Sequence, residues 1–104
     1  MNTNQANTAE DDRILTQHPA GKSGKRIDRK RYELVRVAIL RALKAYGELT
    51  HSELALAARH ILPSDFPGSA QWYIETVKLD LEAKNLIERT GDRPAKYRLA
   101  KGEP

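Results

Sequence analysis

Basic residues are the side chains of this sequence with the clearest potential chemistry, and they are concentrated in one segment. Residues 22–44 contain nine lysines and arginines against two acidic residues, whereas residues 51–104 contain eight of each kind. Clustered cations bind polyanions, and phosphate groups in particular. The uneven placement of the net charge of +4 therefore predicts a nucleic-acid-binding surface, with a merely solvated helix face as the alternative.

The sequence contains no pattern that predicts catalysis or a metal site. It has no cysteine, and its three histidines form no ligand pair at helical spacing. Gly21-Lys22-Ser23 is not a phosphate-binding loop, because Thr16 stands where that motif requires its first glycine. No serine or threonine lies in a recognisable nucleophile motif. We therefore expect a protein that is not an enzyme and that uses neither metal nor cofactor.

Length and composition limit the architecture to one small domain. The chain has 104 residues, of which 39% are apolar, so it has material for a single core. No apolar run approaches the roughly 20 residues that span a bilayer, and the polar N-terminus does not have the pattern of a signal peptide. We expect a cytoplasmic protein without membrane contact. Four segments are predicted: a disordered polar arm (1–16), a basic loop (17–27), a folded domain (28–100) and a tail (101–104).

The first helix is predicted to begin near Asp28, a good N-cap, and to end at Gly47. Five residues at helical spacing form its expected core face: Tyr32, Val35, Ile39, Leu43 and Tyr46. A second apolar stripe lies roughly opposite and consists of Ile27, Leu34, Val37 and Ala38. Either the N-terminal arm covers this stripe through Ile14-Leu15, or another subunit does.

Two more helices and three short strands are predicted downstream. Leu49-Thr50 favours a short strand, and Thr50 with Glu53 forms a capping box for a helix that ends before Pro63. The third helix is expected to follow Ser69 and to end at Lys84, with Ile74, Val77 and Leu81 facing the core. Asn85 suits a helix end, and strands 86–90 and 96–99 flank the turn 91–94.

The order helix, short strand, helix, helix, hairpin resembles the winged helix-turn-helix class. This resemblance implies an α+β fold of three helices with a C-terminal β-hairpin, the wing. More narrowly, residues 17–99 are similar to a family of small bacterial winged-helix proteins without assigned function. The similarity rests on His18-Pro19-Ala20-Gly21-Lys22, Arg26-Ile27-Asp28, Tyr32, Leu62-Pro63, Phe66-Pro67-Gly68, Trp72 and the stretch from Thr76 to Lys84. It departs at Asn85, where a glycine is expected.

The winged-helix resemblance implies that the third helix would enter the major groove of double-stranded DNA while the wing touches its backbone. The candidate phosphate contacts are Lys22, Lys25, Arg26 and Arg29, in and just after the basic loop, which would act as a basic arm. Arg93, Lys96 and Arg98 are the candidates in the wing. The candidate base contacts are Gln71, Thr76 and Lys78. The outer face of this helix is nevertheless apolar and partly acidic, with Trp72, Glu75, Leu79 and Ala83 beside Thr76. We therefore expect binding mainly through phosphates, in the manner of a weakly specific transcriptional regulator.

The alternative is a winged-helix module that binds proteins and forms homodimers without binding DNA. Its candidate interface residues are Leu34, Val37, Trp72 and Leu79. For Trp72 and Leu79 we favour the simpler interpretation, in which the loop 63–68 folds over them with Phe66 and completes the core. Exposure of Trp72 would instead favour a partner surface.

Overall fold

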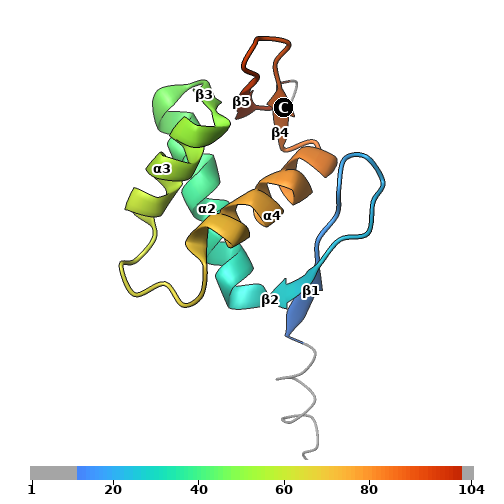
Figure 1. Cartoon of the computed structure of the whole chain (residues 1–104), viewed down its shortest axis with the longest axis vertical. Coiled ribbons are helices and arrows are strands. Elements are labelled where there is room, and N and C mark those ends of the chain that lie inside the picture. Colours follow the sequence, from blue (N-terminus) through green and yellow to red (C-terminus); the bar gives the residue numbers. More distant parts are fainter. Residues whose placement is uncertain (1–11, 102–104) are drawn as a thin grey trace, which may run out of the picture.

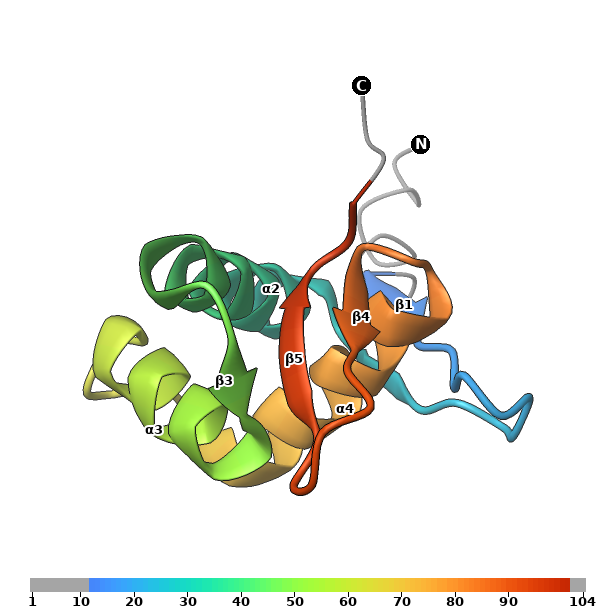
Figure 2. The same ribbon diagram turned by 90° about the horizontal axis from the view of Figure 1, so that it is seen from above.

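The computed structural model describes residues 12–101, which form an α+β fold of three helices and two small antiparallel sheets (Figures 1 and 2). Figure 1 shows α4 lying across α2, with the arm and the C-terminal hairpin near one end of α4. The elements in chain order are β1 (Arg13–Leu15), β2 (Arg26–Asp28), α2 (Arg29–Tyr46), β3 (Leu49–Thr50), α3 (His51–Ile61), α4 (Ala70–Ala83), β4 (Ile87–Arg89) and β5 (Lys96–Leu99).

The helix boundaries follow from local capping chemistry. The Asp28 side chain accepts a hydrogen bond from the backbone amide of Arg31 at 3.0 Å, and α2 ends at Gly47, which has a φ of 87°. Thr50 and Glu53 form a reciprocal capping box at the start of α3. Ser69 caps α4 by accepting a hydrogen bond from the backbone amide of Trp72. The predicted starts of all three helices are confirmed.

The C-terminal sheet has the strand order β3-β5-β4, with both pairs antiparallel. Leu49 faces Tyr97, and Arg89 faces Tyr97 from the other side, so β5 is the central strand. Asn85 has a φ of 63°, the left-handed conformation expected of a residue that ends a helix. The predicted short strand and hairpin are confirmed, and the layout is compatible with a winged helix.

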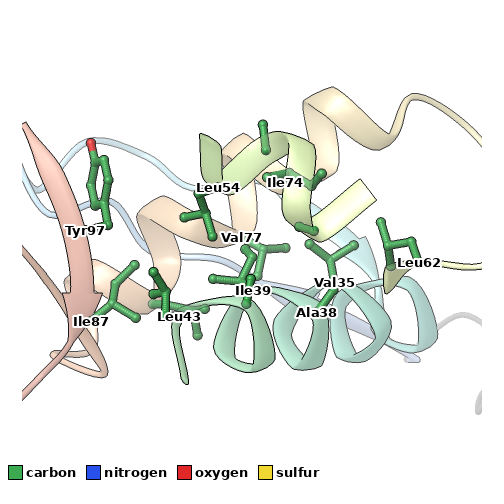
Figure 3. Packing of buried hydrophobic residues seen from close by; sticks show 14 of the residues in the cluster. Val35, Ala38, Ile39, Leu43, Leu54, Leu62, Ile74, Val77, Ile87 and Tyr97 are labelled. Atoms are coloured by element: carbon green, nitrogen blue, oxygen red, sulfur yellow. The ribbon is translucent and has the colours of Figure 1, made fainter. Parts of the chain in front are cut away.

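The core lies where α2 packs against α3 and α4, and the C-terminal sheet closes one end (Figure 3). Its fully buried members include Ile39 and Leu43 of α2, Leu54 of α3 and Val77 of α4. The predicted core position of Tyr46 is wrong, because its side chain is 67% exposed in the last turn of α2, at the edge of the core. No helix within residues 12–101 is long and apolar enough to cross a membrane.

The N-terminal segment forms a β-hairpin, which we call the arm (residues 13–28). Strands β1 and β2 pair antiparallel, with Ile14 opposite Ile27. Ile27 is buried, Ile14 packs against the core, and Leu15 stays exposed. The prediction of a disordered arm through residue 16 and of a loop over 17–27 is therefore wrong for the residues of the two strands. Residues 16–25 between the strands contain neither helix nor strand, and the parts of the predictions that fall on residues 1–11 and on the tail 102–104 lie outside the described residues.

Candidate nucleic-acid interface

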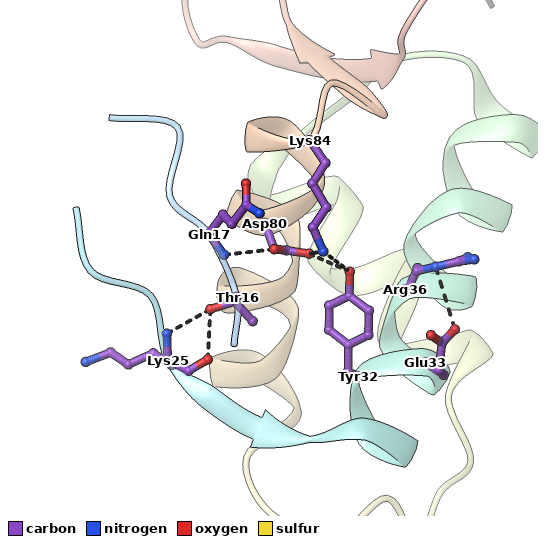
Figure 4. Close-up of polar contacts among 8 residues, drawn as sticks. All are labelled: Thr16, Gln17, Lys25, Tyr32, Glu33, Arg36, Asp80 and Lys84. Carbon is purple, nitrogen blue, oxygen red and sulfur yellow. Dashed lines mark hydrogen bonds and ion pairs between the residues drawn. The ribbon is translucent and has the colours of Figure 1, made fainter. Parts of the chain in front are cut away.

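A buried carboxylate fixes the arm against α4 (Figure 4). Oδ1 of Asp80 accepts a hydrogen bond of 2.8 Å from the backbone amide of Gln17, and Asp80 is completely buried. Its second oxygen forms an ion pair of 3.0 Å with the Lys84 ammonium group and accepts a hydrogen bond from the Tyr32 hydroxyl. The arm, α2 and α4 therefore meet at one polar cluster inside the protein, which we call the Asp80 cluster (Gln17, Tyr32, Asp80 and Lys84).

The negative charge of Asp80 is compensated by the other members of the Asp80 cluster. The Lys84 ammonium also donates to the Tyr32 hydroxyl at 3.3 Å, and it lies 5.3 Å from the centre of the Tyr32 ring. Burial of the phenol, together with its hydrogen bond to Asp80, raises the pKa of Tyr32 above its ordinary value. Tyr32 therefore stays a neutral hydrogen-bond donor to the carboxylate at physiological pH.

The two sides of the arm approach each other closely at Thr16 and Gly24. Thr16 is buried and exchanges hydrogen bonds with the backbone of Lys25: its hydroxyl accepts from the amide at 2.9 Å, and its own amide donates to the carbonyl at 2.8 Å. A Cβ atom on Gly24 would lie 1.6 Å from the carbonyl oxygen of Thr16. Only glycine fits there, which explains how this basic segment can close into a hairpin.

The arm partly covers the outer face of α4. Thr76 and Leu79 line a small cavity of about 90 Å³ together with arm residues between Thr16 and Lys25, and both are only partly exposed. The expectation that the loop 63–68 covers Leu79 and Trp72 is wrong. The arm lies beside Leu79 instead.

Trp72 remains 42% exposed near the start of α4. Phe66 of the preceding loop packs edge-on against Tyr73, with the ring centres 5.5 Å apart. Trp72 meets the same tyrosine edge-on at 5.0 Å. The loop therefore contributes to the core through Tyr73 and leaves the indole open to solvent.

Lys78 is not a surface residue, so its predicted role as a base contact is wrong. It is 5% exposed, and its ammonium lies 3.0 Å from Nδ1 of His51 and 4.1 Å from the centre of the Tyr97 ring. Burial first, and then the charge of Lys78, lower the pKa of His51 below its ordinary value. Neutral His51 can thereby accept a hydrogen bond from the Lys78 ammonium, and Lys78 joins α4 to His51 of α3 and to Tyr97 of β5.

The other two predicted base contacts differ in accessibility. Gln71 is exposed, and its side-chain oxygen accepts a hydrogen bond of 3.2 Å from Arg59 of α3. Thr76 lies beside the arm and is partly covered. The outer face of α4 also presents Glu75, which is exposed and would repel phosphate. This face has few donors for reading bases.

The C-terminal hairpin uses several of its cations internally. Arg98 pairs with Glu88 at 2.7 Å and with Glu48 at 3.1 Å, and Arg89 pairs with Glu82 of α4 at 3.1 Å. Arg93 is exposed in the turn and Lys96 is partly exposed next to it. No carboxylate within residues 12–101 pairs with either of these two. The free positive charge of the hairpin is thus at its tip.

Among the exposed cations of the arm, Lys22, Lys25 and Arg26 pair with no carboxylate in the described part of the chain. Arg29, the fourth predicted arm contact, forms an ion pair of 3.1 Å with Asp12. Accessible basic side chains therefore lie at two places near α4, one on the arm and one at the tip of the C-terminal hairpin.

The remaining predicted interface residues lie elsewhere, on the far stripe of α2. Leu34 and Val37 are each 44% exposed, although Ile27 and Ala38 of the same stripe are buried. The arm therefore covers only part of this stripe. Among residues 12–101, no group of three or more histidines and carboxylates is arranged to hold a metal ion.

Sequence patterns missed the Asp80 cluster. Asp80 and Lys84 have the i, i+4 spacing of a helical ion pair, which was available as a signal. Their burial depends on the arm and on Tyr32, which are distant in the sequence.

Comparison with known proteins places the chain in a family without assigning an activity. Residues 13–97 match the model of a family described as a family of unknown function (DUF6958), and the matched segment runs from the first strand of the arm into β5. No curated protein and no solved structure matches the chain. Because the match covers well over half of its residues, the chain belongs to this family of unknown function.

Proposed function

We propose that this chain is a winged-helix protein that binds double-stranded DNA mainly through phosphate contacts and acts by binding rather than by catalysis. In this proposal α4 is the helix that faces the duplex, the C-terminal hairpin is the wing, and the arm is a second basic finger. The proposal includes a cytoplasmic location, where DNA is accessible in a bacterial cell.

The observation that carries the proposal is the attachment of the arm to α4 by the Asp80 cluster. Because Gln17 is fixed to Asp80, the arm, which carries the exposed Lys22 and Lys25, is held beside the C-terminal half of α4 (Figure 1). The hairpin that carries Arg93 and Lys96 lies near the same end of the helix (Figure 1). A preorganised pair of basic fingers suits the phosphate backbone, whose charge is regular and independent of sequence.

The same arrangement disfavours reading of bases. The arm partly covers Thr76 and Leu79, and Lys78 is buried. An outer face that presents Glu75 and Trp72 has few of the bidentate groups that distinguish base pairs in the major groove, and the exposed Gln71 already pairs with Arg59. The proposal therefore predicts similar affinities for duplexes of unrelated sequence.

The test is a fluorescence-anisotropy titration of labelled duplexes of unrelated sequence at low salt. The variants Lys22→Gln/Lys25→Gln and Arg93→Gln/Lys96→Gln are each expected to weaken binding at least tenfold. The control Lys44→Gln/Lys101→Gln removes the same charge from exposed positions outside the arm and wing, and should bind within about twofold of the wild type. Absence of duplex binding at low salt, or equal losses in all three variants, would reject the proposal.

A second candidate function is protein interaction, and the exposure of Leu34 and Val37 on α2 favours it. Leu34 and Val37 belong to α2 and to neither the arm nor the wing, so a protein partner on α2 does not require the cations of those two fingers.

A further inference from the structure

An apolar groove runs along the outer side of α2. It encloses about 730 Å³ between α2 and the end of α3. Leu34 and Val37 of α2 lie on one side, and Ile61, Leu62 and Pro63 lie on the other. Leu34, Val37 and Ile61 are among the exposed large apolar residues of the chain. Such a continuous apolar surface is a typical docking site for an apolar helix face.

The charges around the groove are unbalanced. Its two acidic residues already have partners: Asp12 pairs with Arg29 at 3.1 Å, and Glu33 pairs with Arg36 at 3.6 Å. Two further cations of the groove, Lys30 and Arg41, are exposed and pair with no carboxylate within residues 12–101. The groove therefore presents a net positive rim to a ligand.

The two free cations bracket the apolar residues. Lys30, Leu34, Val37 and Arg41 follow one another at spacings of four, three and four, so they form one stripe along α2. At 1.5 Å per residue this stripe is about 17 Å long, which corresponds to about three turns of a docked helix. We infer that the groove binds an amphipathic helix of another protein, with acidic residues at both ends of its apolar face.

A second copy of this chain is a poorer occupant. A two-fold axis that sets Leu34 against Val37 of the second copy also sets Lys30 against Arg41 of that copy at both ends. Moving the axis to Val37 brings Glu33 of each copy near Arg41 of the other, but it also sets Lys30 of each copy against Lys44 of the other. Like charges placed opposite each other across an interface disfavour association. Charge complementarity therefore selects an acidic helix over the chain's own α2.

The probe for this inference is a synthetic, fluorescein-labelled helical peptide of four turns. It carries leucines at i, i+3, i+4 and i+7, with glutamates at both ends of that face. Anisotropy should show saturable binding to the full chain, weakened at least tenfold by Val37→Glu. The matched control Leu86→Glu introduces the same charge at a position of similar exposure (42%, against 44% for Val37) outside the groove, and should leave the affinity unchanged. Duplex affinity should also be unchanged in Val37→Glu, which separates this test from that of DNA binding.

A charge exchange tests the electrostatic half of the inference even if Val37→Glu perturbs folding. Lys30→Glu/Arg41→Glu should bind the acidic peptide at least tenfold more weakly than the wild type does. The same variant should bind a counterpart peptide that has lysines in place of the glutamates. Circular dichroism checks that the variants remain folded. Three results would overturn the inference. The first is binding of the acidic peptide no tighter than that of a peptide of the same composition in scrambled order. The second is a dimer in sedimentation that Val37→Glu dissociates, and the third is binding of anionic vesicles that depends on Val37.

Discussion

The backbone amide of Gln17 donates a hydrogen bond of 2.8 Å to Oδ1 of Asp80, across 63 positions of sequence. This contact joins the arm to α4 inside the protein, where the Lys84 ammonium and the Tyr32 hydroxyl occupy the other carboxylate oxygen. A buried carboxylate with three partners holds those partners in a defined geometry. If one of these contacts is lost, a buried polar group is left with neither a protein partner nor water to bind. The position of the arm is therefore coupled to the packing of α2 against α4.

Asp80→Ala is expected to lower the free energy of unfolding by about 3 kcal/mol, because the Gln17 amide and the buried Tyr32 hydroxyl lose their acceptor and the partly exposed Lys84 loses its ion pair. Tyr32→Phe should cost less, about 2 kcal/mol, because the hydroxyl's hydrogen bonds with Asp80 and Lys84 are lost while the ion pair between those two residues remains. Urea denaturation measures both. Asp65→Ala, at an exposed loop position, is the control and should lie within about 0.5 kcal/mol of the wild type. If Asp80→Ala were as stable as the control, the cluster would have no structural role.

Gly24→Ala should detach the two sides of the arm, because the new Cβ atom would clash with the carbonyl oxygen of Thr16. Amide hydrogen exchange at Thr16 and Gln17 should become much faster, while exchange in the core of α2 remains slow. Gly91→Ala is the matched control, since a Cβ there meets nothing within 4 Å. Unchanged protection at Thr16 in Gly24→Ala would mean that the arm does not require this close approach.

The stability of the chain should depend on the protonation of His51. Burial and the charge of Lys78 lower its pKa in the folded state below the ordinary value of 6.5, whereas Glu75 acts weakly in the opposite direction. Neutral His51 therefore contributes stability that is fully present above pH 6.5 and is lost as the pH falls toward the lowered pKa. Thermal unfolding between pH 8 and pH 5 should show a smaller loss in His51→Asn than in the wild type. Equal losses in the two proteins would contradict this assignment.

The fluorescence of Trp72 should report the exposure of its side chain directly, because Trp72 is the single tryptophan of the chain. With 42% of its surface accessible, its fluorescence should be quenched readily by acrylamide, and Trp72→Phe should change the free energy of unfolding by no more than about 1 kcal/mol. A blue-shifted emission that resists acrylamide would indicate that the indole is buried, either by the chain itself or by a second copy.

The order of the domain elements could be predicted from the sequence because their ends depend on local chemistry. Asp28, Thr50 and Ser69 begin helices by accepting a hydrogen bond from the backbone amide three positions further on. Asn85 marks the end of α4 by a conformation that few other residue types tolerate. Such features require no knowledge of the tertiary structure.

The surroundings of α4 could not be predicted in the same way. Lys78 and Asp80 flank the inward stripe of α4 on opposite sides, so helical periodicity alone leaves their burial undecided. Lys78 is buried because β5 packs against it, and Asp80 is buried because the arm docks on it. The arm itself escaped prediction because its strands are three residues long and its closure depends on the contact of Gly24 with Thr16.

The most direct test of the proposed function is the salt dependence of duplex binding. A plot of log affinity against log salt concentration should fall with a slope of about −0.9 per phosphate neutralised. Lys22→Gln/Lys25→Gln should make this slope shallower by up to about 1.8, since two phosphate contacts are removed. The control Lys44→Gln/Lys101→Gln should retain the wild-type slope. An affinity that does not change with salt, or a slope that the arm variant leaves unchanged, would contradict the proposal that the arm binds DNA phosphates.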